Sequence, residues 1–359
     1  MSIWFTEHGI PIRNIWHMLV YAWQEPGGRS RLSADEVESA PSLEALFAQL
    51  LARAVQQRMR LGLGQAYVDQ TQTIRGVRGR VNFAESRKRH TFENGEVQCS
   101  FQEYSVNEPR NQVIRSTLLK LVQAGELGAD RVQAEALRQR LRWLVRNLDG
   151  VELVELDPRA VHRLALVQND QDYRFMLALC ELVLLHQMPA DAAGDRPVPG
   201  LDREALVLHR IYERFVAGFY RFHLKGWDVK AQKRLDWHAD LANEHLPAMI
   251  PDLVLTHRST GQVILLDTKF TAESLVDNRW GKPVYDSSHL YQLYAYLRSQ
   301  EDRSPAHRQA AGILLYPAIH SQGSEAVQLQ GHEFRIEWLD ITAAWQDVER
   351  QLLKIIGDS

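Results

Sequence analysis

Apolar residues recur at helical spacing along most of the first half of the chain. The pattern is strongest over residues 42–62, where apolar positions return every three to four residues and line one helix face. The same spacing predicts further helices over 10–23, 110–124, 130–148 and 171–188. Residues 65–105 instead favour strands, and the Asn94-Gly95 pair is typical of a hairpin turn. We therefore expect a helical N-terminal region that carries a small β insertion.

The second half of the chain alternates more regularly between helix and strand patterns. Amphipathic helices are predicted over 203–224 and 288–300. Apolar runs typical of strands occupy 227–237, 248–257, 262–269 and 311–319. The order helix, three strands, helix, strand predicts a mixed central sheet flanked by helices, in the α+β or α/β class.

A segment dense in Pro, Gly, Ala and Asp separates the two halves. It spans residues 189–202 and reads PADAAGDRPVPGLD, a composition typical of a linker. The total of 359 residues is enough for two domains that each bury a core. We expect an N-terminal domain over 1–188 and a C-terminal domain over 203–359.

Composition and charge exclude several classes of protein. Lys and Arg number 42 and Asp and Glu number 45, a net charge of −3, so the chain is not a polycation that coats nucleic acid. A DNA enzyme with its positive charge in one groove remains compatible with this balance. Two cysteines, Cys99 and Cys180, cannot build a disulfide framework or a zinc knuckle. No segment has the length of a membrane span or the pattern of a signal peptide, so we expect a cytoplasmic protein.

The strongest chemical signal is the pair Pro251-Asp252 and Asp267-Thr268-Lys269 on two consecutive predicted strands. If these strands form a hairpin centred between Ser259 and Thr260, residues opposite each other have numbers that sum to 519. Asp252 then faces Asp267, with Cβ atoms ~4.5–5.5 Å apart. Lys269 points to the same face as Asp267, because side chains alternate along a strand.

Two carboxylates at this separation repel each other, and a divalent cation between them removes the repulsion. Mg²⁺ prefers oxygen ligands and commonly binds one or two carboxylates together with substrate phosphate. Lys269 would then orient a water molecule or neutralise charge on the phosphate, which is the chemistry of phosphodiester hydrolysis. In the alternative interpretation, Asp252 caps a turn while Asp267 and Lys269 form a surface ion pair. The apolar flanks IPDLVL and VILLD favour buried strands and the metal site.

Three residues on predicted helices extend this set. Glu213 lies in the middle of the helix over 203–224, and Gln292 and Tyr296 stand four residues apart on one face of the helix over 288–300. Taken separately, Glu213 is explained by a solvated helix face or an arginine partner, and Gln292 and Tyr296 by amphipathic packing.

Together these residues resemble the PD-(D/E)xK nuclease superfamily, and the chain more narrowly resembles the McrC family, the nuclease subunits of McrBC-type modification-dependent restriction systems. The closer resemblance rests on IPIRNIWHMLVYAW (10–23), RGRVNF (78–83), NEPRNQVIRSTLLKL (107–121), IPDLVL (250–255), LLDTKF (265–270) and LYQLYAYL (290–297). It implies a restriction-endonuclease-like C-terminal domain and assigns a role to each site residue. Asp252 and Asp267 are the metal-binding carboxylates, Lys269 is the catalytic lysine and Glu213 is the helix acid. Gln292 and Tyr296 support the site or the DNA backbone, and Arg279 and Lys282 are DNA-contact candidates.

The resemblance also implies a cofactor and partners. It implies Mg²⁺, with Mn²⁺ as a substitute, and double-stranded DNA carrying a modified base of the 5-methylcytosine type. It further implies a hexameric AAA+ GTPase, McrB, into which the N-terminal region inserts and whose hydrolysis it stimulates. The sequence has no G-x-x-x-x-G-K-[ST] loop, so we expect this chain to bind no nucleotide itself.

A basic cluster lies in the predicted β insertion. Its members are Arg75, Arg78, Arg80, Arg87, Lys88 and Arg89. They are explained by a solvated hairpin whose arginine stems cover apolar surface, by docking on the partner ring, or by contact with DNA phosphates. For the whole chain, the alternatives to a ring-dependent endonuclease are a non-catalytic stalk that activates the ring and a stand-alone nuclease in DNA repair. The intact Asp252, Asp267 and Lys269 argue against the first, and the large N-terminal region argues against the second.

Overall fold

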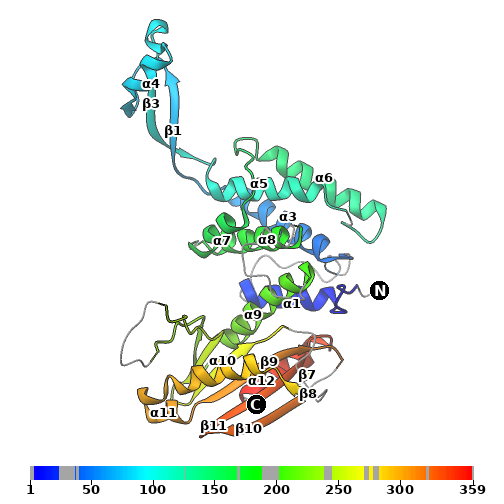
Figure 1. Cartoon of the computed structure of the whole chain (residues 1–359). Helices are drawn as coiled ribbons and strands as arrows, with labels where there is room; N and C mark the ends of the chain where they lie inside the picture. Colours follow the sequence, from blue (N-terminus) through cyan, green and yellow to red (C-terminus); the bar gives the residue numbers. More distant parts are fainter. Residues whose placement is uncertain are drawn as a thin grey trace. The chain divides into compact units, whose positions relative to one another are not determined.

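The computed structural model divides the chain into two compact units (Figure 1). One comprises Glu44–Asp195, and the other combines Met1–Leu43 with Arg196–Ser359. The residues that the structure describes are 4–23, 37, 40–125, 127–167, 170–187, 202–237, 245–270, 275–277, 283–320 and 323–357. Most of the predicted linker 189–202, together with Arg279 and Lys282, therefore lies outside the described residues.

Helices form the body of the Glu44–Asp195 unit. They are α3 (Leu43–Leu61), α5 (Pro109–Val122), α6 (Arg131–Asn147), α7 (Pro158–Val167) and α8 (Gln171–Gln187). Every residue from Phe175 to Leu184 of α8 is buried, so this helix forms the centre of the unit. Four of these helices confirm the sequence-based expectation, and α7 was not expected.

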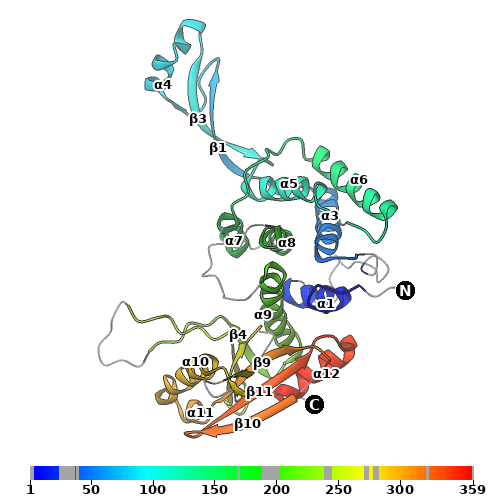
Figure 2. The ribbon, with the colours of Figure 1, turned by 45° about the vertical axis from the view of Figure 1, so that its right-hand side comes forward.

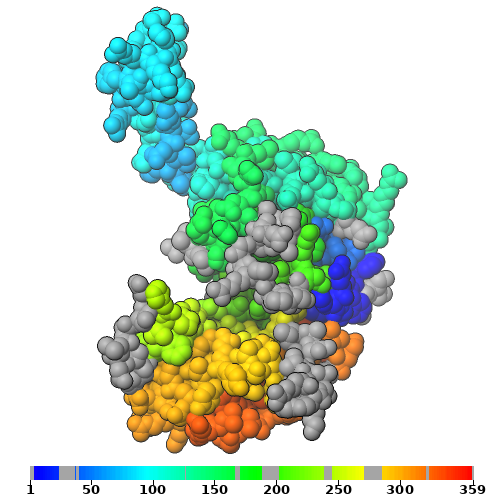
Figure 3. All heavy atoms as spheres, in the orientation of Figure 1, coloured from blue at the N-terminus to red at the C-terminus, as the bar shows by residue number. Residues whose placement is uncertain are grey.

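The predicted β insertion is present as an arm formed by residues 66–105. Its sheet has the order β1 (Ala66–Ile74), β3 (Val97–Ser105), β2 (Arg80–Val81), with β3 antiparallel to both neighbours. The prediction that Asn94-Gly95 forms the turn of a hairpin is wrong. The helix α4 (Phe83–Lys88) and the 3₁₀ helix η1 (Thr91–Asn94) separate β2 from β3, and Gly95, with φ of 69°, ends η1. Figures 2 and 3 show the arm as a narrow projection from its own helices.

One buried amide fixes the base of this arm. Asn111 of α5 donates from Nδ2 to the carbonyl oxygens of Gly64 (3.0 Å) and Val106 (2.8 Å), which flank β1 and β3. Tyr173 of α8 donates its hydroxyl to Asn111 Oδ1 at 2.7 Å and accepts from the Gly64 amide at 2.8 Å. Both ends of the arm are thus hydrogen-bonded to the helices that carry it.

A mixed six-stranded sheet forms the centre of the second unit. Its order is β10 (Gly323–Leu329), β11 (His332–Asp340), β9 (Ala311–Ala318), β6 (Val263–Thr268), β5 (Leu253–His257), β4 (Trp227–Ala231). The pairs β11–β9 and β9–β6 are parallel and the remaining pairs are antiparallel. The helices around the sheet are α1 (Ile12–Trp23), α9 (Arg203–His223), α10 (Ser287–Arg298) and α12 (Trp345–Ile356). A short hairpin of β7 (Leu275–Asp277) and β8 (Pro283–Tyr285) precedes α10, and η3 (Glu301–Arg303) and α11 (Pro305–Arg308) follow it.

This arrangement confirms the expected mixed sheet and the expected order of elements. The helix, three strands, helix and strand are α9, β4 to β6, α10 and β9. Two strands are shorter than predicted, since β4 already ends at Ala231 and β5 begins only at Leu253. The elements β10, β11 and α12 were not expected. All seven residues of β10 are exposed, so this edge strand carries no inward-facing apolar pattern.

The expected N-terminal domain over 1–188 is wrong in its first part, because residues 1–43 belong with the C-terminal unit. The physical reason is the close packing of α1 on α9. A Cβ atom added to Gly218 of α9 would lie 1.9 Å from the carbonyl oxygen of Tyr21, so only glycine permits this crossing. Buried Asn14 of α1 also donates to the carbonyl oxygens of Ile341 (2.8 Å) and Ala343 (2.9 Å) before α12.

Candidate active site

The ends of β5 and β6 bring the predicted carboxylates together. The ladder pairs Leu253 with Leu266 and Val254 with Leu265, so the numbers of opposite residues sum to 519 as predicted. Asp252 directly precedes β5, and Asp267 is the fifth residue of β6. The next position of the same register therefore places Asp252 opposite Asp267.

Asp267 and Lys269 form an ion pair in which the aspartate is buried and the lysine is partly buried. Asp267 is only 3% exposed, and its Oδ2 contacts the Nζ of Lys269. The Lys269 amide donates to the carbonyl oxygen of Leu315 at 3.0 Å, which fixes the lysine backbone beside β9. The predicted common face of the two side chains is confirmed, and the alternative of a surface ion pair is wrong.

The Asp252 carboxylate is held by the neighbouring strand. Its Oδ2 accepts hydrogen bonds from the Thr268 amide at 2.7 Å and from the Thr268 hydroxyl at 2.6 Å. Both donors lie on β6, sixteen residues further along the chain, so the alternative of a local turn cap after Pro251 is wrong. Thr268 is buried, and sequence reasoning had given it no role.

Helix α10 supports Lys269 through two side chains. Lys269 Nζ donates to Gln292 Oε1 at 2.8 Å, and Gln292 Nε2 donates to the hydroxyl of Tyr296 at 2.7 Å. The Tyr296 hydroxyl in turn donates to the carbonyl oxygen of Ile250 at 3.3 Å, two residues before Asp252. The predicted placement of Gln292 and Tyr296 at the site is confirmed. Their contacts are with the lysine and with the strand that carries Asp252.

Glu213 also lies at this site, where an unexpected residue links it to Asp252. Gln232 Nε2 donates to Glu213 Oε1 at 2.5 Å and to Asp252 Oδ1 at 3.1 Å. Glu213 therefore does not belong to a freely solvated helix face. Gln232 was missed because it follows β4 in a polar segment with no motif, and only the pairing of β4 with β5 places it beside Asp252.

Burial and mutual repulsion raise the pKa values of all three carboxyl groups. Burial, followed by the charge of Glu213, raises the pKa of Asp252 to about 6. Burial and then Asp252 raise the pKa of Asp267, while burial is the largest cause of the raised pKa of Glu213. Perturbed carboxyl groups that face each other are typical of functional sites, and a cation among them would stabilise their ionised forms.

The side chains present fit a hard divalent cation such as Mg²⁺. Asp252 and Asp267 offer carboxylate oxygens, the ligand type that Mg²⁺ prefers. Within the described ranges, no group of three or more His, Cys, Asp and Glu side chains is arranged to hold a metal ion. Mg²⁺ usually binds one or two protein carboxylates, and water and substrate phosphate complete its coordination. Asp252 and Asp267 would supply the two carboxylates.

Two histidines lie near the ion pair. Burial and then the charge of Lys269 lower the pKa of His209 on α9 and of His289 on α10. The His289 Nδ1 lies 2.9 Å from the hydroxyl of Tyr316 on β9. The lowered pKa values favour neutral imidazoles, which add no positive charge to the site.

The six basic residues of the arm are all exposed, and three of them lie near acidic side chains. Arg75 lies 3.7 Å from Glu96, Arg78 lies 3.5 Å from Glu103, and Arg89 lies 2.7 Å from Glu85. The guanidinium of Arg78 also covers the ring of Phe101 at 4.0 Å. Coverage of apolar surface is thus confirmed for Arg78. Docking and DNA contact stay predictions for the cluster, which includes the exposed Arg80, Arg87 and Lys88.

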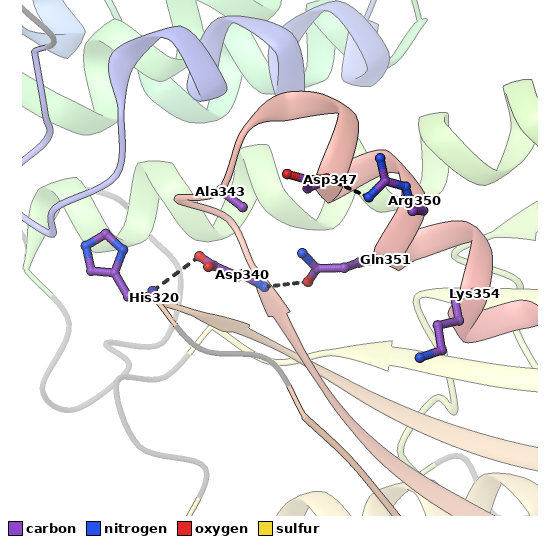
Figure 4. Close-up of a pocket in the computed structure, with 7 residues that line it drawn as sticks. All are labelled: His320, Asp340, Ala343, Asp347, Arg350, Gln351 and Lys354. Atoms are coloured by element: carbon purple, nitrogen blue, oxygen red, sulfur yellow. Dashed lines mark hydrogen bonds and ion pairs between the residues drawn. The ribbon is translucent and has the colours of Figure 1, made fainter.

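A separate hollow of about 520 Å³ lies between α12 and the ends of β9 and β11 (Figure 4). Its lining carries both signs of charge and consists of His320, Asp340, Ala343, Asp347, Arg350, Gln351 and Lys354. None of these is a predicted site residue. Asp340 is hydrogen-bonded through its amide to Gln351 and through its carboxylate to the amides of His320 and Thr342. These contacts link the strand ends to α12.

Comparison with known proteins places this chain in a family. A family model described as McrBC 5-methylcytosine restriction system component matches residues 9–317. The Type IV methyl-directed restriction enzyme EcoKMcrBC of Escherichia coli (strain K12) is 25% identical over 355 residues, which cover 97% of this chain and 98% of that protein.

Two solved assemblies from Thermococcus gammatolerans are also similar. A half-complex of McrB AAA+ hexamers with bound McrC has 14% identity and a TM-score of 0.48, over 97% of this chain and 76% of that chain. A McrBC complex has 15% identity and a TM-score of 0.38, over 60% of this chain and 59% of that chain.

In the described residues, no helix has the length and apolar character to cross a membrane. Because the family model spans most of the sequence, the chain belongs to the family of McrBC 5-methylcytosine restriction system components.

Proposed function

We propose that this chain is the Mg²⁺-dependent DNA endonuclease subunit of a McrBC-like restriction system, with a nuclease domain of the PD-(D/E)xK type. One observation carries the proposal. Asp252, Asp267 and Lys269 meet at the ends of two adjacent strands, with Asp267 buried against the lysine. A relative that is 25% identical over nearly its whole length is described as a restriction enzyme.

Each residue of the site then has a distinct task. Asp252 and Asp267 would hold Mg²⁺, which when bound polarises the phosphate and lowers the pKa of a water molecule. Lys269 carries three N–H donors, of which Asp267 and Gln292 accept two. The third donor remains for the attacking water or for a phosphate oxygen. Gln292 and Tyr296 restrict the position of the lysine and therefore the direction of that donor.

The second part of the proposal is a partner that hydrolyses nucleotide. We propose that the chain assembles with a McrB-like AAA+ GTPase ring, stimulates its hydrolysis and acts on double-stranded DNA that carries a modified base. The arm formed by residues 66–105 is the surface best suited to dock on the ring. Besides its six exposed basic residues, it presents Phe83 and Phe92, which are 69% and 45% exposed and stack on each other. Exposed apolar side chains among charges are typical of interaction sites.

A paired assay of cleavage and GTP hydrolysis tests the proposal. The chain is purified with and without its AAA+ partner, and methylated and unmodified DNA are offered with Mg²⁺ and GTP. Lys269→Ala should lower cleavage by at least ~100-fold, because it removes a charge that stabilises the transition state. It should leave the stimulation of GTP hydrolysis unchanged. The matched control is Lys230→Ala, which changes an exposed lysine of β4 and should affect neither activity.

The same assay separates the competing functions. A wild-type chain that stimulates the ring but never cuts DNA would be a non-catalytic activator. A chain that cuts equally well without the ring would be a stand-alone nuclease. If Lys269→Ala cut DNA at the wild-type rate, the site would be wrongly assigned. If a folded Lys269→Ala lost both activities, the separation of roles would be wrong.

A further inference from the structure

Gln232 occupies the strand position beside Asp252 on the side opposite to Asp267. The register of β4 and β5 pairs Ala231 with Leu253, and its next position pairs Gln232 with Asp252. The Gln232 amide accordingly donates to the carbonyl oxygen of Asp252 at 3.0 Å. Three neighbouring strands therefore place Gln232, Asp252 and Asp267 at one level of the sheet.

The backbone of Gln232 is in a conformation that residues other than glycine rarely adopt. Its φ is 51°, in the left-handed region. Strained positions of this kind persist where the surrounding structure holds them, and they concentrate at functional sites. Here the chain leaves strand β4 at Gln232, and the side chain of Gln232 reaches Glu213 on α9 and Asp252, which directly precedes β5.

The side-chain amide makes two short contacts with two acids. Nε2 carries two hydrogens, which is enough for one to go to Glu213 Oε1 at 2.5 Å and one to Asp252 Oδ1 at 3.1 Å. The second oxygen of Asp252 is already held by Thr268. The orientation of the Asp252 carboxylate is therefore defined from both sides.

We propose that Gln232 is a positioning residue of the divalent-cation site. Its side-chain amide holds Glu213 and Asp252 at a fixed separation before the cation binds. This role rests on the proposed nuclease function. A neutral donor suits the task, because lysine at this position would compete with the cation and glutamate would add a third negative charge beside Glu213 and Asp252. Glutamine orders the two carboxylates and leaves their negative charge available to Mg²⁺.

Direct measurement of Mg²⁺ binding tests this role. Isothermal titration of the full chain with Mg²⁺, without DNA or nucleotide, is compared for wild type, Gln232→Met and Gln232→Asn. Methionine keeps the length and removes the donor. Asparagine suits the left-handed backbone, so it keeps the protein folded, but it is one methylene too short to reach both acids. The matched control is Gln328→Met on the exposed strand β10.

Both Gln232 variants should bind Mg²⁺ about 10-fold more weakly, the usual cost of losing a residue that orients a metal ligand. With the partner ring and DNA, the Mg²⁺ concentration for half-maximal cleavage should rise by a similar factor, while the rate at saturating Mg²⁺ changes less. Gln328→Met should match wild type in both measurements.

The proposal is overturned if folded Gln232→Asn binds Mg²⁺ within twofold of wild type, even if its melting temperature falls, because the residue would then be merely structural. A wild-type chain that neither binds Mg²⁺ nor cuts DNA overturns the nuclease function as well. A wild type that does both, together with an unchanged Gln232→Asn, overturns only the role of Gln232.

Discussion

Replacing Gly218 by alanine should destabilise the C-terminal unit, because it removes the space in which α1 crosses α9. The added Cβ would lie 1.9 Å from the Tyr21 carbonyl oxygen and 2.7 Å from its carbon. Non-bonded atoms settle at about 3.5 Å, so α1 would have to move outward by roughly 1.5 Å. These neighbours are backbone atoms, so no change of side-chain rotamer relieves the clash.

The size of the effect follows from three contributions. Overfilling a packed interface costs about 1–3 kcal/mol. Moving α1 also weakens the hydrogen bonds of buried Asn14 to Ile341 and Ala343, and an unsatisfied buried amide costs about 1–3 kcal/mol. Alanine recovers about 1 kcal/mol relative to glycine inside a helix. The central expectation is a loss of about 3 kcal/mol, or roughly 6–12 °C in Tm for a unit of this size.

Differential scanning calorimetry of the full chain measures this loss, and hydrogen exchange of α1 locates it. The matched control is Gly125→Ala, since a Cβ at Gly125 meets nothing within 4 Å. That variant should stay within about 0.5 kcal/mol of wild type. If Gly218→Ala left both the unfolding transition and the exchange of the α1 amides unchanged, the assignment of residues 1–43 to the C-terminal unit would be refuted.

Three further predictions concern the site and the arm. Tyr296→Phe removes the hydroxyl between Gln292 and Ile250 and should slow DNA cleavage by about 10-fold without changing GTP hydrolysis; equal cleavage would contradict a supporting role. The pKa of Asp252 is raised to about 6, so the folded state binds its proton more tightly than the unfolded state does. As the pH rises from 4 to 8 in EDTA, the free energy of unfolding of wild type should therefore fall by up to ~3 kcal/mol relative to that of Asp252→Asn. Chemical denaturation that gives the same difference between the two proteins at every pH would exclude this. Asn111→Leu should destabilise the Glu44–Asp195 unit by about 2 kcal/mol and speed hydrogen exchange at both ends of the arm, whereas exchange spread evenly over the unit would argue against a clamp.

The sequence predicts those parts of the site that depend on local geometry. The register between Asp252 and Asp267 follows from one short turn, and the ladder confirms it. Gln292 and Tyr296 share a helix face because they stand four residues apart, and their contacts confirm that placement. In both cases the relevant spacing is short enough to be set by the period of a single strand or helix.

The remaining features depend on contacts between distant segments. Gln232 reaches Asp252 across twenty residues, and the segment between them has no regular alternation that would set the pairing. The partner of α1 is set by Gly218, about 200 positions away, and a glycine inside a helix pattern does not reveal which helix will cross it. Such pairings arise from tertiary packing, which composition and periodicity do not encode.

The corrected boundary ties the start of the chain to the chemistry of the site. Helix α9 carries Gly218 against α1 and carries Glu213, which Gln232 links to Asp252, so one helix connects the N-terminal segment to the carboxylates. Burial is the largest cause of the raised pKa values of Glu213 and Asp252, and the charge of Glu213 raises the pKa of Asp252 further, so ionising these carboxyl groups costs the folded unit free energy. Bound Mg²⁺ would relieve the repulsion, so the cation and the N-terminal helix should stabilise the same unit. Mg²⁺ should therefore raise the free energy of unfolding of both wild type and Gly218→Ala, and a smaller gain in the variant, measured by the same calorimetry, would show by linkage that displacing α1 weakens Mg²⁺ binding.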